Sequence, residues 1–245
     1  MSALADLEVA LRSRRAYAEV ADSHTQCSSV EDSLGLVKGR DQILAGWVAI
    51  GPQEVSVHLD LGSMIAFGVK AEERSWLGHR WVEWQDGRII REVLVEDSGR
   101  SRSAAAEHAP LGELRAGQGQ FSAGSSAILP PEFPDEARAL ADWLHTAWNG
   151  RAIDQFAEDW LQHLLELAPD GTFYFERALC QDKRIALLWR FLGHHESGRR
   201  IRLIGSSLFT RKPECGFVSD ETVMDRGALE AQLHRALLDY STDYL

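Results

Sequence analysis

The chain has 245 residues, which is enough for two domains of ordinary size, each with a hydrophobic core of its own. Hydrophobic residues make up 44% and charged residues 26% of the sequence, so a largely disordered chain is excluded. The formal net charge of −11 would repel phosphate backbones and anionic lipids. We therefore expect neither nucleic acid nor a membrane as a partner.

Cysteine usage and the lack of targeting signals predict a cytoplasmic protein. Cys27, Cys180 and Cys215 are too few and too scattered for a disulfide framework, and no two have the spacing of a zinc or redox motif. Charged residues interrupt the N-terminal stretch before it could form a signal sequence, and no long apolar run follows. Because dinucleotide-binding and phosphate-binding loop motifs are missing as well, we expect no metal and no cofactor.

The first half of the chain reads as helices followed by a four-stranded meander. Apolar residues at helical spacing predict a helix over 2–20, with Arg12 on its solvated polar face. The polar stretch 22–33 is expected to be less ordered, and a second helix is expected before residue 51. Alternating patterns then predict four strands, at 53–60, 64–74, 76–84 and 88–96.

The second half repeats this order after a linker. Prolines and glycines gather at 101–134, and two helices are expected between Pro134 and Pro169. Four strands follow, at 172–179, 184–194, 200–210 and 217–224. The repeated order predicts a tandem arrangement of three parts: a shortened domain at 1–100, a linker at 101–134 and a second domain at 135–245.

Each predicted sheet has an outer face that must be covered. The economical solution is an intramolecular pseudo-dimer, in which the two repeats pack through their sheets. Trp81 or Trp84 would supply the large apolar area that such packing needs. Homodimerisation of the whole chain is left open.

Short sequence patterns recur in both halves. In the second half they are Trp148-Asn149-Gly150-Arg151 and the stretches 185–195 and 216–225. In the first half the corresponding patterns are the stretches 39–43 and 84–92. Together these patterns resemble the SnoaL-like polyketide cyclase family within the nuclear transport factor 2-like superfamily.

The resemblance implies an α+β protein built from two cone-shaped, cystatin-like α+β barrel domains, each with helices packed on a curved antiparallel sheet. It also implies a pocket between helices and sheet, which enzyme members use for acid–base chemistry on small hydrophobic molecules such as polyketides, steroids or terpene epoxides. Where these enzymes have a catalytic acid or base, it is a carboxylate on a late strand. The nearest matching positions are Glu92, Glu96, Asp97, Asp220, Glu221 and Asp225.

Strand alternation selects a histidine in the second half. His194 and His195 are adjacent, so their side chains point to opposite faces of a strand. His195 shares its face with Trp189 and Phe191, and we therefore predict that His195 faces the cavity and that the two aromatic residues bind substrate. A bulge after Gly193 would exchange the two histidines. The simpler alternative places both on the surface of a turn.

An acidic partner for this histidine is sought on the last strand. Asp220 and Glu221 point to opposite faces there, and the sequence leaves open which of the two faces inward. Either carboxylate, paired with His195, could transfer a proton near neutral pH. The alternative is a solvent-facing acid on an edge strand.

The first half offers a different set of candidates. His79 and Trp81 share one strand face, and with Glu92 they are the candidates for substrate binding in this half. Arg80 and Trp84 occupy the opposite face. The simpler alternative for Trp81 and Trp84 is that this tryptophan-rich strand packs against the other repeat.

Two functional hypotheses follow. The first is a small-molecule-binding enzyme of the polyketide cyclase or isomerase type, which carries out cyclisation, isomerisation or hydrolysis by proton transfer. The second is a non-catalytic module that binds a ligand or another protein. A carboxylate and an imidazole that meet in an enclosed pocket would favour the enzyme, whereas a filled cone with both groups on the surface would favour the module.

Overall fold

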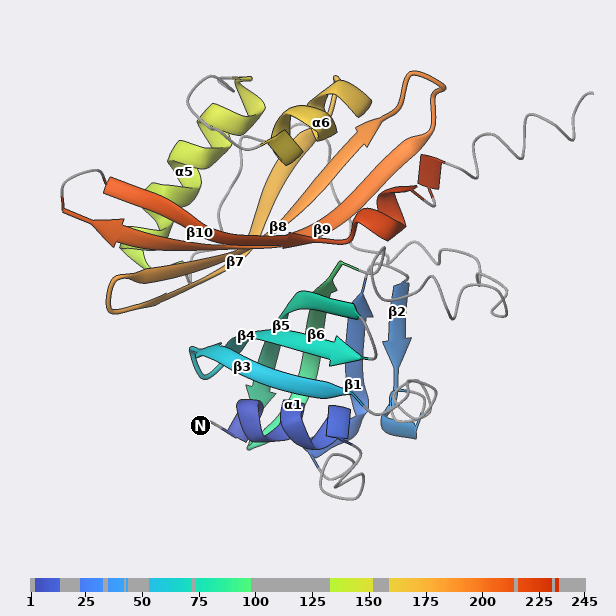
Figure 1. Cartoon of the computed structure of the whole chain (residues 1–245), viewed down its shortest axis with the longest axis vertical. Coiled ribbons are helices and arrows are strands. Elements are labelled where there is room, and N and C mark those ends of the chain that lie inside the picture. The colour runs from blue at the N-terminus through green and yellow to red at the C-terminus, as the bar shows by residue number, and fades with distance from the viewer. Residues whose placement is uncertain are drawn as a thin grey trace, which may run out of the picture. The chain divides into compact units, whose positions relative to one another are not determined.

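The computed structural model divides the chain into two compact units, residues 1–119 and 120–245 (Figure 1). The division falls inside the stretch predicted to be a linker, most of which lies outside the described residues. The structure describes residues 3–13, 23–32, 35–41, 43, 53–71, 74–97, 133–151, 159–213, 216–230 and 232–233. In both units helices pack on a sheet, as the α+β prediction requires.

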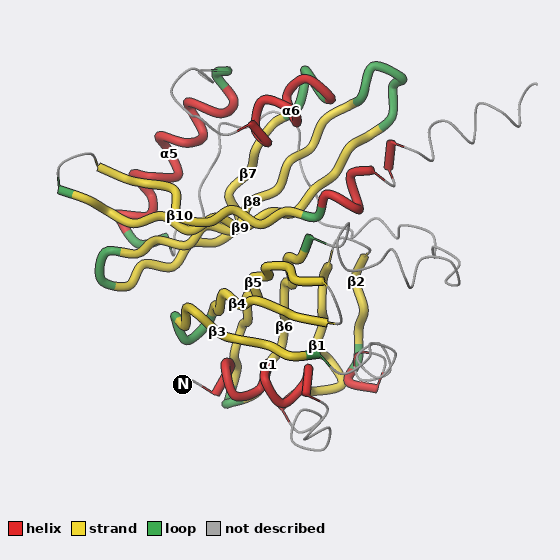
Figure 2. The backbone as a smooth tube through the Cα atoms, in the orientation of Figure 1, coloured by secondary structure: helices red, strands yellow, loops and turns green. Residues whose placement is uncertain are grey.

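The first unit is a six-stranded sheet packed against a helix, as the backbone trace shows (Figure 2). Its strands are arranged in the order β2-β1-β6-β5-β4-β3, and every neighbouring pair is antiparallel except β1 and β6, which are parallel. The elements are α1 (Ala3–Ser13), β1 (His24–Asp32), β2 (Gly35–Lys38), β3 (Glu54–Asp60), β4 (Met64–Ala71), β5 (Arg74–Gln85) and β6 (Arg88–Glu96).

All four strands predicted in the first half are present, but two more were missed. The polar stretch 22–33, which was expected to be less ordered, contains β1, and β2 follows it. Its polar residues find buried partners: His24 is 2% exposed, and the Ser28 hydroxyl donates a hydrogen bond of 2.5 Å to the backbone oxygen of Ile89. The first sheet therefore has more strands than the second, although its domain was interpreted as the shortened copy.

The core of the first unit lies between α1 and one face of the sheet, here called the inner face. Leu4 and Leu7 of α1 pack there against Ile65, Phe67 and Val82 of the sheet. Burial of these apolar side chains supplies the main driving force for the unit to fold. His79 and Trp81 have the opposite strand parity to Val82 and therefore lie on the outer face, where both are buried.

The second unit is a four-stranded antiparallel meander with two helices on its inner face (Figure 1). The four strands confirm the sequence prediction, with bounds that differ by two residues or fewer. The elements are α5 (Asp135–Asn149), α6 (Asp159–Leu167), β7 (Thr172–Gln181), β8 (Arg184–His194), β9 (Arg200–Lys212) and β10 (Gly216–Met224). After β10, residues 226–230 are helical.

Aromatic rings fill the inner face of the second unit. The Trp189 ring stacks on Trp160 with centroids 5.4 Å apart, and it meets Trp148 edge-on at 6.0 Å. Gly205 lies directly beneath, because a Cβ at this position would come within 2.0 Å of the Trp189 ring. Phe173 closes the cluster against the same ring at 5.5 Å. Such interlocking rings leave little free volume above this sheet.

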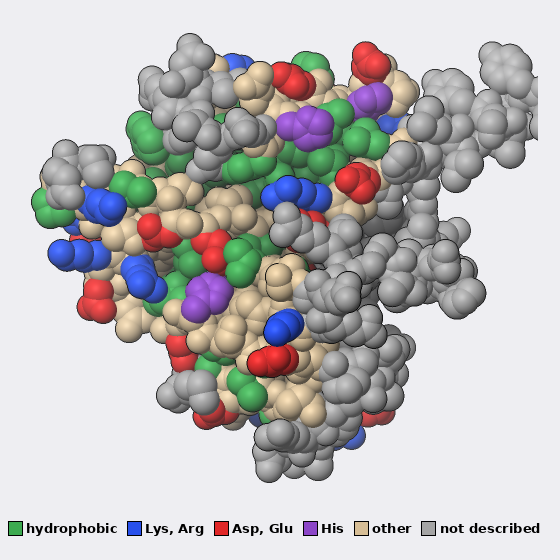
Figure 3. Space-filling view, viewed as in Figure 1, with side chains coloured by type: hydrophobic (Ala, Val, Ile, Leu, Met, Phe, Trp, Pro, Cys, Tyr) green, Lys and Arg blue, Asp and Glu red, His purple; other side chains and the backbone are tan. Residues whose placement is uncertain are grey.

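The surface charges, the helices and the metal-binding side-chain types would carry the signs of a charged partner, a membrane or a metal ion. On the face shown in Figure 3, acidic and basic side chains are intermixed. None of the helices in the described ranges has the length and apolarity needed to cross a bilayer. The described residues also contain no group of three or more His, Cys, Asp or Glu side chains placed to bind a metal ion.

Candidate functional site

A cluster of buried charged residues interrupts the apolar core of the first unit. It consists of Glu8, Arg12, His24, Arg80, Glu92 and Glu96. These residues come from α1, β1, β5 and β6, so the cluster joins the helix to the middle of the sheet. Five of the six are buried, and because buried charges are rare in proteins unless they are paired, the group marks a candidate functional site.

Helix periodicity places two of these charges on the inner face. Leu4, Glu8 and Arg12 are spaced four residues apart and therefore follow one another along the same side of α1. Leu4 and Glu8 are fully buried, and Arg12 is 3% exposed. The Arg12 Nε donates to Glu8 Oε1 at 2.5 Å. The prediction that Arg12 lies on a solvated polar face is therefore wrong, because that side of α1 packs against the sheet.

Glu92 lies at the centre of the cluster and contacts both of its neighbours. Its Oε1 is 2.7 Å from Nε2 of His24, and its Oε2 accepts a hydrogen bond from Nη1 of Arg80. The Arg80 Nε lies 2.5 Å from Oε2 of Glu8, so that one guanidinium bridges two carboxylates. Glu8, Arg80 and Glu92 are each fully buried. A charge-assisted network of this kind fixes the orientation of every member.

The electrostatics of the cluster keep Glu92 ionised. Burial by itself would raise the pKa of Glu92, but the positive charge of Arg80 and the hydrogen bond from His24 outweigh this effect, so its pKa is lowered. Likewise, burial would lower the pKa of Arg12, but the carboxylates of Glu96 and Glu8 raise it. Glu92 is therefore a permanent acceptor, and Nε2 of His24 carries the hydrogen that lies between them.

The second ring nitrogen of His24 has a different neighbour. Its Nδ1 lies 3.0 Å from the hydroxyl oxygen of Ser23. When Nε2 donates to Glu92, the neutral imidazole presents Nδ1 as an acceptor, the tautomer that a carboxylate partner selects. The arrangement is thus a carboxylate, an oriented imidazole and an adjacent hydroxyl, which together can accept and return a proton at Nδ1.

The structure does not assemble the histidine site predicted for the second unit. β8 ends at His194, and His195 lies in the following turn, where its Nδ1 is 2.9 Å from the Ser197 hydroxyl. His194 is on the surface and pairs with the equally exposed Asp170 at 2.7 Å. Hydrogen bonds from the backbone and side chain of His194 lower the pKa of Asp170. Both histidines thus serve the turn, which was the simpler alternative.

The predicted acidic partners lie at the far end of the same sheet. Glu221 pairs with Leu208 on β9, and Asp220 occupies the bulge beside it, where it accepts a hydrogen bond from Thr210. The turn that contains His195 joins the other end of β9, at Arg200. At about 3.3 Å per residue, the part of β9 between Arg200 and the residues that contact the two acids, Leu208 and Thr210, spans roughly 30 Å. Pairing of His195 with either acid was therefore a wrong prediction, because strand register was ignored.

The five residues predicted to bind substrate lie in different parts of the two units. Trp189 and Phe191 do face inward, as alternation predicted, but they are fully buried among other rings. The Trp189 Nε1 donates to Ser207 at 2.9 Å. His79 and Trp81 lie on the outer face of the first sheet, away from the cluster. Of the predicted binding residues, only Glu92 belongs to the cluster.

Sequence reasoning missed four members of the cluster, and for three of them a signal was present. Glu8 and Arg12 follow Leu4 at helical spacing, and Glu8 stands between the apolar residues Leu7 and Val9. Arg80 alternates with Trp76 and Val82 on a strand, a polar residue on an apolar face. His24 carries no such signal, because the polar stretch around it does not read as a strand.

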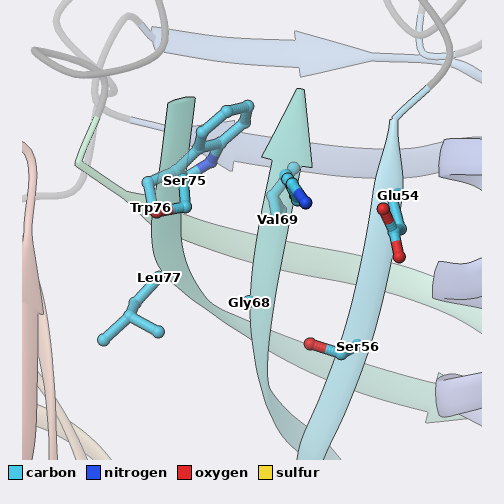
Figure 4. Close-up of a pocket in the computed structure, with 8 residues that line it drawn as sticks. Glu54, Ser56, Gly68, Val69, Ser75, Trp76 and Leu77 are labelled. Atoms are coloured by element: carbon cyan, nitrogen blue, oxygen red, sulfur yellow. The ribbon is translucent and has the colours of Figure 1, made fainter. Parts of the chain in front are cut away.

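A shallow groove of about 330 Å³ lies elsewhere on the first unit (Figure 4). Ser56 of β3 and Leu77 of β5 flank Gly68 of β4, whose missing side chain leaves the hollow. Glu54 at its edge is solvent-exposed, and the groove holds neither a histidine nor a buried acid. The groove offers no group poised for proton transfer, and the buried cluster remains the candidate site.

Comparison with known proteins finds similarity at the level of structure only. No protein-family model matches the sequence, and no curated protein matches it. A proposed ketosteroid isomerase from Kribbella flavida matches 38% of this chain and 73% of its own at 20% identity and a TM-score of 0.34. An NTF2-like protein of unknown function from Cytophaga hutchinsonii matches 40% of this chain and 94% of its own at 11% identity and a TM-score of 0.33.

A further similar structure carries the description expected from the sequence. A proposed SnoaL-like polyketide cyclase from Shewanella putrefaciens matches 42% of this chain and 83% of its own at 11% identity, with a TM-score of 0.35. The resemblance to SnoaL-like and NTF2-like proteins is therefore found among solved structures as well, over about 40% of the chain. A likeness of this size does not extend to the reaction or the ligand, which depend on the side chains.

Proposed function

We propose that the first unit binds a small apolar molecule and transfers a proton on it through His24 and Glu92. The observation that carries this proposal is the fully buried Glu92 carboxylate in contact with both an imidazole and a guanidinium. A carboxylate and an imidazole meeting in an enclosed site is the arrangement expected of an acid–base enzyme. Cyclisation, isomerisation and hydrolysis are the reaction classes that need only such a pair.

Each residue has a defined role in the proposed reaction. The Nδ1 atom of His24 accepts a proton from the substrate or from a water molecule at the position next to the Ser23 hydroxyl. Glu92 orients the ring through Nε2 and stabilises the imidazolium that forms, which then returns the proton to another atom of the substrate. Arg80 keeps Glu92 ionised, and Glu8 holds Arg80 in place from the helix.

Charge balance supports this role for His24. Glu8, Glu92 and Glu96 contribute three negative charges to the cluster, whereas Arg12 and Arg80 contribute two positive charges. A proton on His24 brings the net charge of these six described residues to zero. In a buried site with low effective dielectric, this compensation stabilises the imidazolium intermediate.

The test compares two Glu→Gln substitutions in the full chain, one on β6 and one on the neighbouring strand β5. The probes are styrene oxide, whose hydrolysis is followed directly, and 2-tetralone, whose exchange of α-hydrogens for deuterium is followed by mass spectrometry. The wild-type chain should accelerate at least one of them, and Glu92→Gln should reduce that rate about a hundredfold. Glu83→Gln, a half-buried residue on the outer face, should leave it unchanged. Equal rates in both variants would refute the proposal.

A second candidate function is a non-catalytic module that binds a ligand or another protein. It is favoured by the inner face of the second unit, which is filled with aromatic rings and has its histidines on the surface. In that case the charged cluster only holds α1 on the sheet. Rates no higher than those in buffer for both probes, with the wild-type chain folded, would favour this alternative.

A further inference from the structure

Arg12 lies where the buried cluster meets the surface. The inner members Glu8, Arg80 and Glu92 are fully buried, whereas the side chain of Glu96 is 19% exposed. Glu96 is the last residue of β6, and its partner Arg12 is in the last turn of α1. A molecule that enters the cluster from solvent therefore meets the Arg12–Glu96 ion pair first.

Glu96 has fewer charged partners among the described residues than the other two carboxylates. Within the described part of the chain it makes a single ion pair, with Nη2 of Arg12. Glu92 contacts both Arg80 and His24, and Glu8 contacts both guanidiniums. The Glu96 side chain is 19% exposed, so its carboxylate has solvent to move into while the rest of the cluster remains in place.

The Arg12 guanidinium has a second partner, the side-chain amide of Gln53. The Arg12 Nη1 donates to Oε1 of Gln53 at 2.5 Å, which places the Gln53 amide beside the guanidinium. The same amide carries two N–H donors of its own, and the Gln53 backbone is fixed by a 2.9 Å hydrogen bond to the Arg12 oxygen. A planar carboxylate can accept from a guanidinium and an amide together, one oxygen to each.

An apolar surface adjoins these donors. Gln53 directly precedes β3, and Val55 and Val57 of that strand are half-buried and pack against the core of the first unit. The Phe67 ring lies beneath the guanidinium, with its centroid 4.7 Å from the Arg12 Cζ. The site thus combines a charged anchor with a short hydrophobic wall, the two features that bind an amphipathic acid.

We propose that Arg12 is a binding site for a small monocarboxylate with an apolar tail, which enters by exchange with the carboxylate of Glu96. The exchange replaces one negative charge with another, so the charge of the buried cluster does not change. A dianion would add an uncompensated charge, and a neutral molecule would leave Arg12 with one carboxylate fewer. The proposed proton transfer does not require a carboxylate on the bound molecule. Carboxylate binding at Arg12 can therefore be tested independently of turnover.

The test measures binding of benzoate to the full chain by isothermal titration calorimetry, with benzamide and phthalate as the neutral and dianionic counterparts. Wild type should bind benzoate more tightly than either counterpart. Glu96→Gln removes the internal competitor and should tighten benzoate binding about fivefold. Because this is a gain of affinity, misfolding cannot imitate it. The control Glu83→Gln makes the same charge change on the outer face and should leave benzoate affinity as in wild type.

The site itself is tested by Gln53→Leu, which removes the amide donors and preserves the side-chain size. This variant should weaken benzoate binding several-fold while the fold is retained, as checked by circular dichroism. The proposal is overturned if benzoate and benzamide bind equally, or if Glu96→Gln and Glu83→Gln have the same benzoate affinity. Neither result would alter the case for His24 and Glu92, which is decided by the proton-transfer assay.

Discussion

The inner faces of the two units show two ways of filling the space between helices and a curved sheet. In the second unit Trp148, Trp160 and Trp189 interlock, so the space is occupied by side chains that hold one another. In the first unit the same space contains Arg80 and Glu92 with their partners. Aromatic packing stabilises a domain through burial of apolar surface. Buried ion pairs stabilise it less, because the charges lose their hydration, but they place groups that can transfer protons in the interior.

The difference teaches that similar element order does not imply a similar interior. In each unit a four-stranded antiparallel meander, β3 to β6 or β7 to β10, comes after a helix, and the first unit has β1 and β2 in between. The polar residue Arg80 on the inner face of β5 is what separates the first interior from the second, where Trp189 occupies the middle of β8. Whether the two units superpose as a tandem repeat, and whether they pack as a pseudo-dimer, stay predictions.

The largest effect is expected from Arg80→Met in the first unit. Removing the guanidinium leaves Glu8 and Glu92 buried without their shared counter-charge, at a cost of about 3–5 kcal/mol in the free energy of unfolding. Arg91→Met is the matched control, because Arg91 is partly exposed and its ion pairs lie at 3.4 and 3.7 Å. Urea unfolding read out by hydrogen exchange at β5 and β6 separates the first unit from the second. An equal loss of unfolding free energy in both variants would mean that the buried cluster stabilises the first unit no more than a partly exposed ion pair does.

A smaller effect is expected from Gly205→Ala in the second unit. The added Cβ would come within 2.0 Å of the Trp189 ring, which is fully buried and has nowhere to move. Overpacking of this kind costs about 1–3 kcal/mol. Gly68→Ala in the first unit is the control, since its Cβ would meet only the Ser56 hydroxyl at 3.3 Å. If hydrogen exchange at β8 and β9 does not change in Gly205→Ala, the second interior is looser than described.

The smallest effect is a pH dependence confined to the first unit. The pKa of Glu92 is lower in the folded chain than in the unfolded chain, where it is about 4.3. Its ionised form therefore stabilises the fold fully above about pH 5, and this contribution is lost as the pH falls through the folded-state pKa. Hydrogen exchange at β6 between pH 6 and pH 3.5 measures it. Glu92→Gln should abolish this part of the pH dependence, and an unchanged profile would contradict the assigned pairing.

The alternation of apolar and polar residues predicted most of the strands, but it did not predict β1 or the residues that contact Glu92. Alternation located the four strands from β3 to β6 because their apolar residues pack on one face. It could not locate β1, where the buried residues His24 and Ser28 are polar and find their partners on a strand about 60 residues away.

The site was missed because contacts between elements depend on register and on layer order. His195 was assigned its partners from strand parity alone, and parity does not report position along the strand. Glu92 was among the predicted binding residues, but its partners Arg80 and His24 were not, because parity only placed Arg80 on the face of Trp84 and the stretch around His24 did not read as a strand.

The central claim is that proton transfer belongs to the first unit and not to the second. It is tested most directly by comparing the turnover of styrene oxide or 2-tetralone in His24→Gln and His195→Gln, each as the full chain. We predict about a hundredfold loss of rate in His24→Gln, because the buried proton acceptor is gone, and an unchanged rate in His195→Gln, because that residue only holds a turn. A loss in His195→Gln with His24→Gln at the wild-type rate would contradict the account and return the site to the second unit.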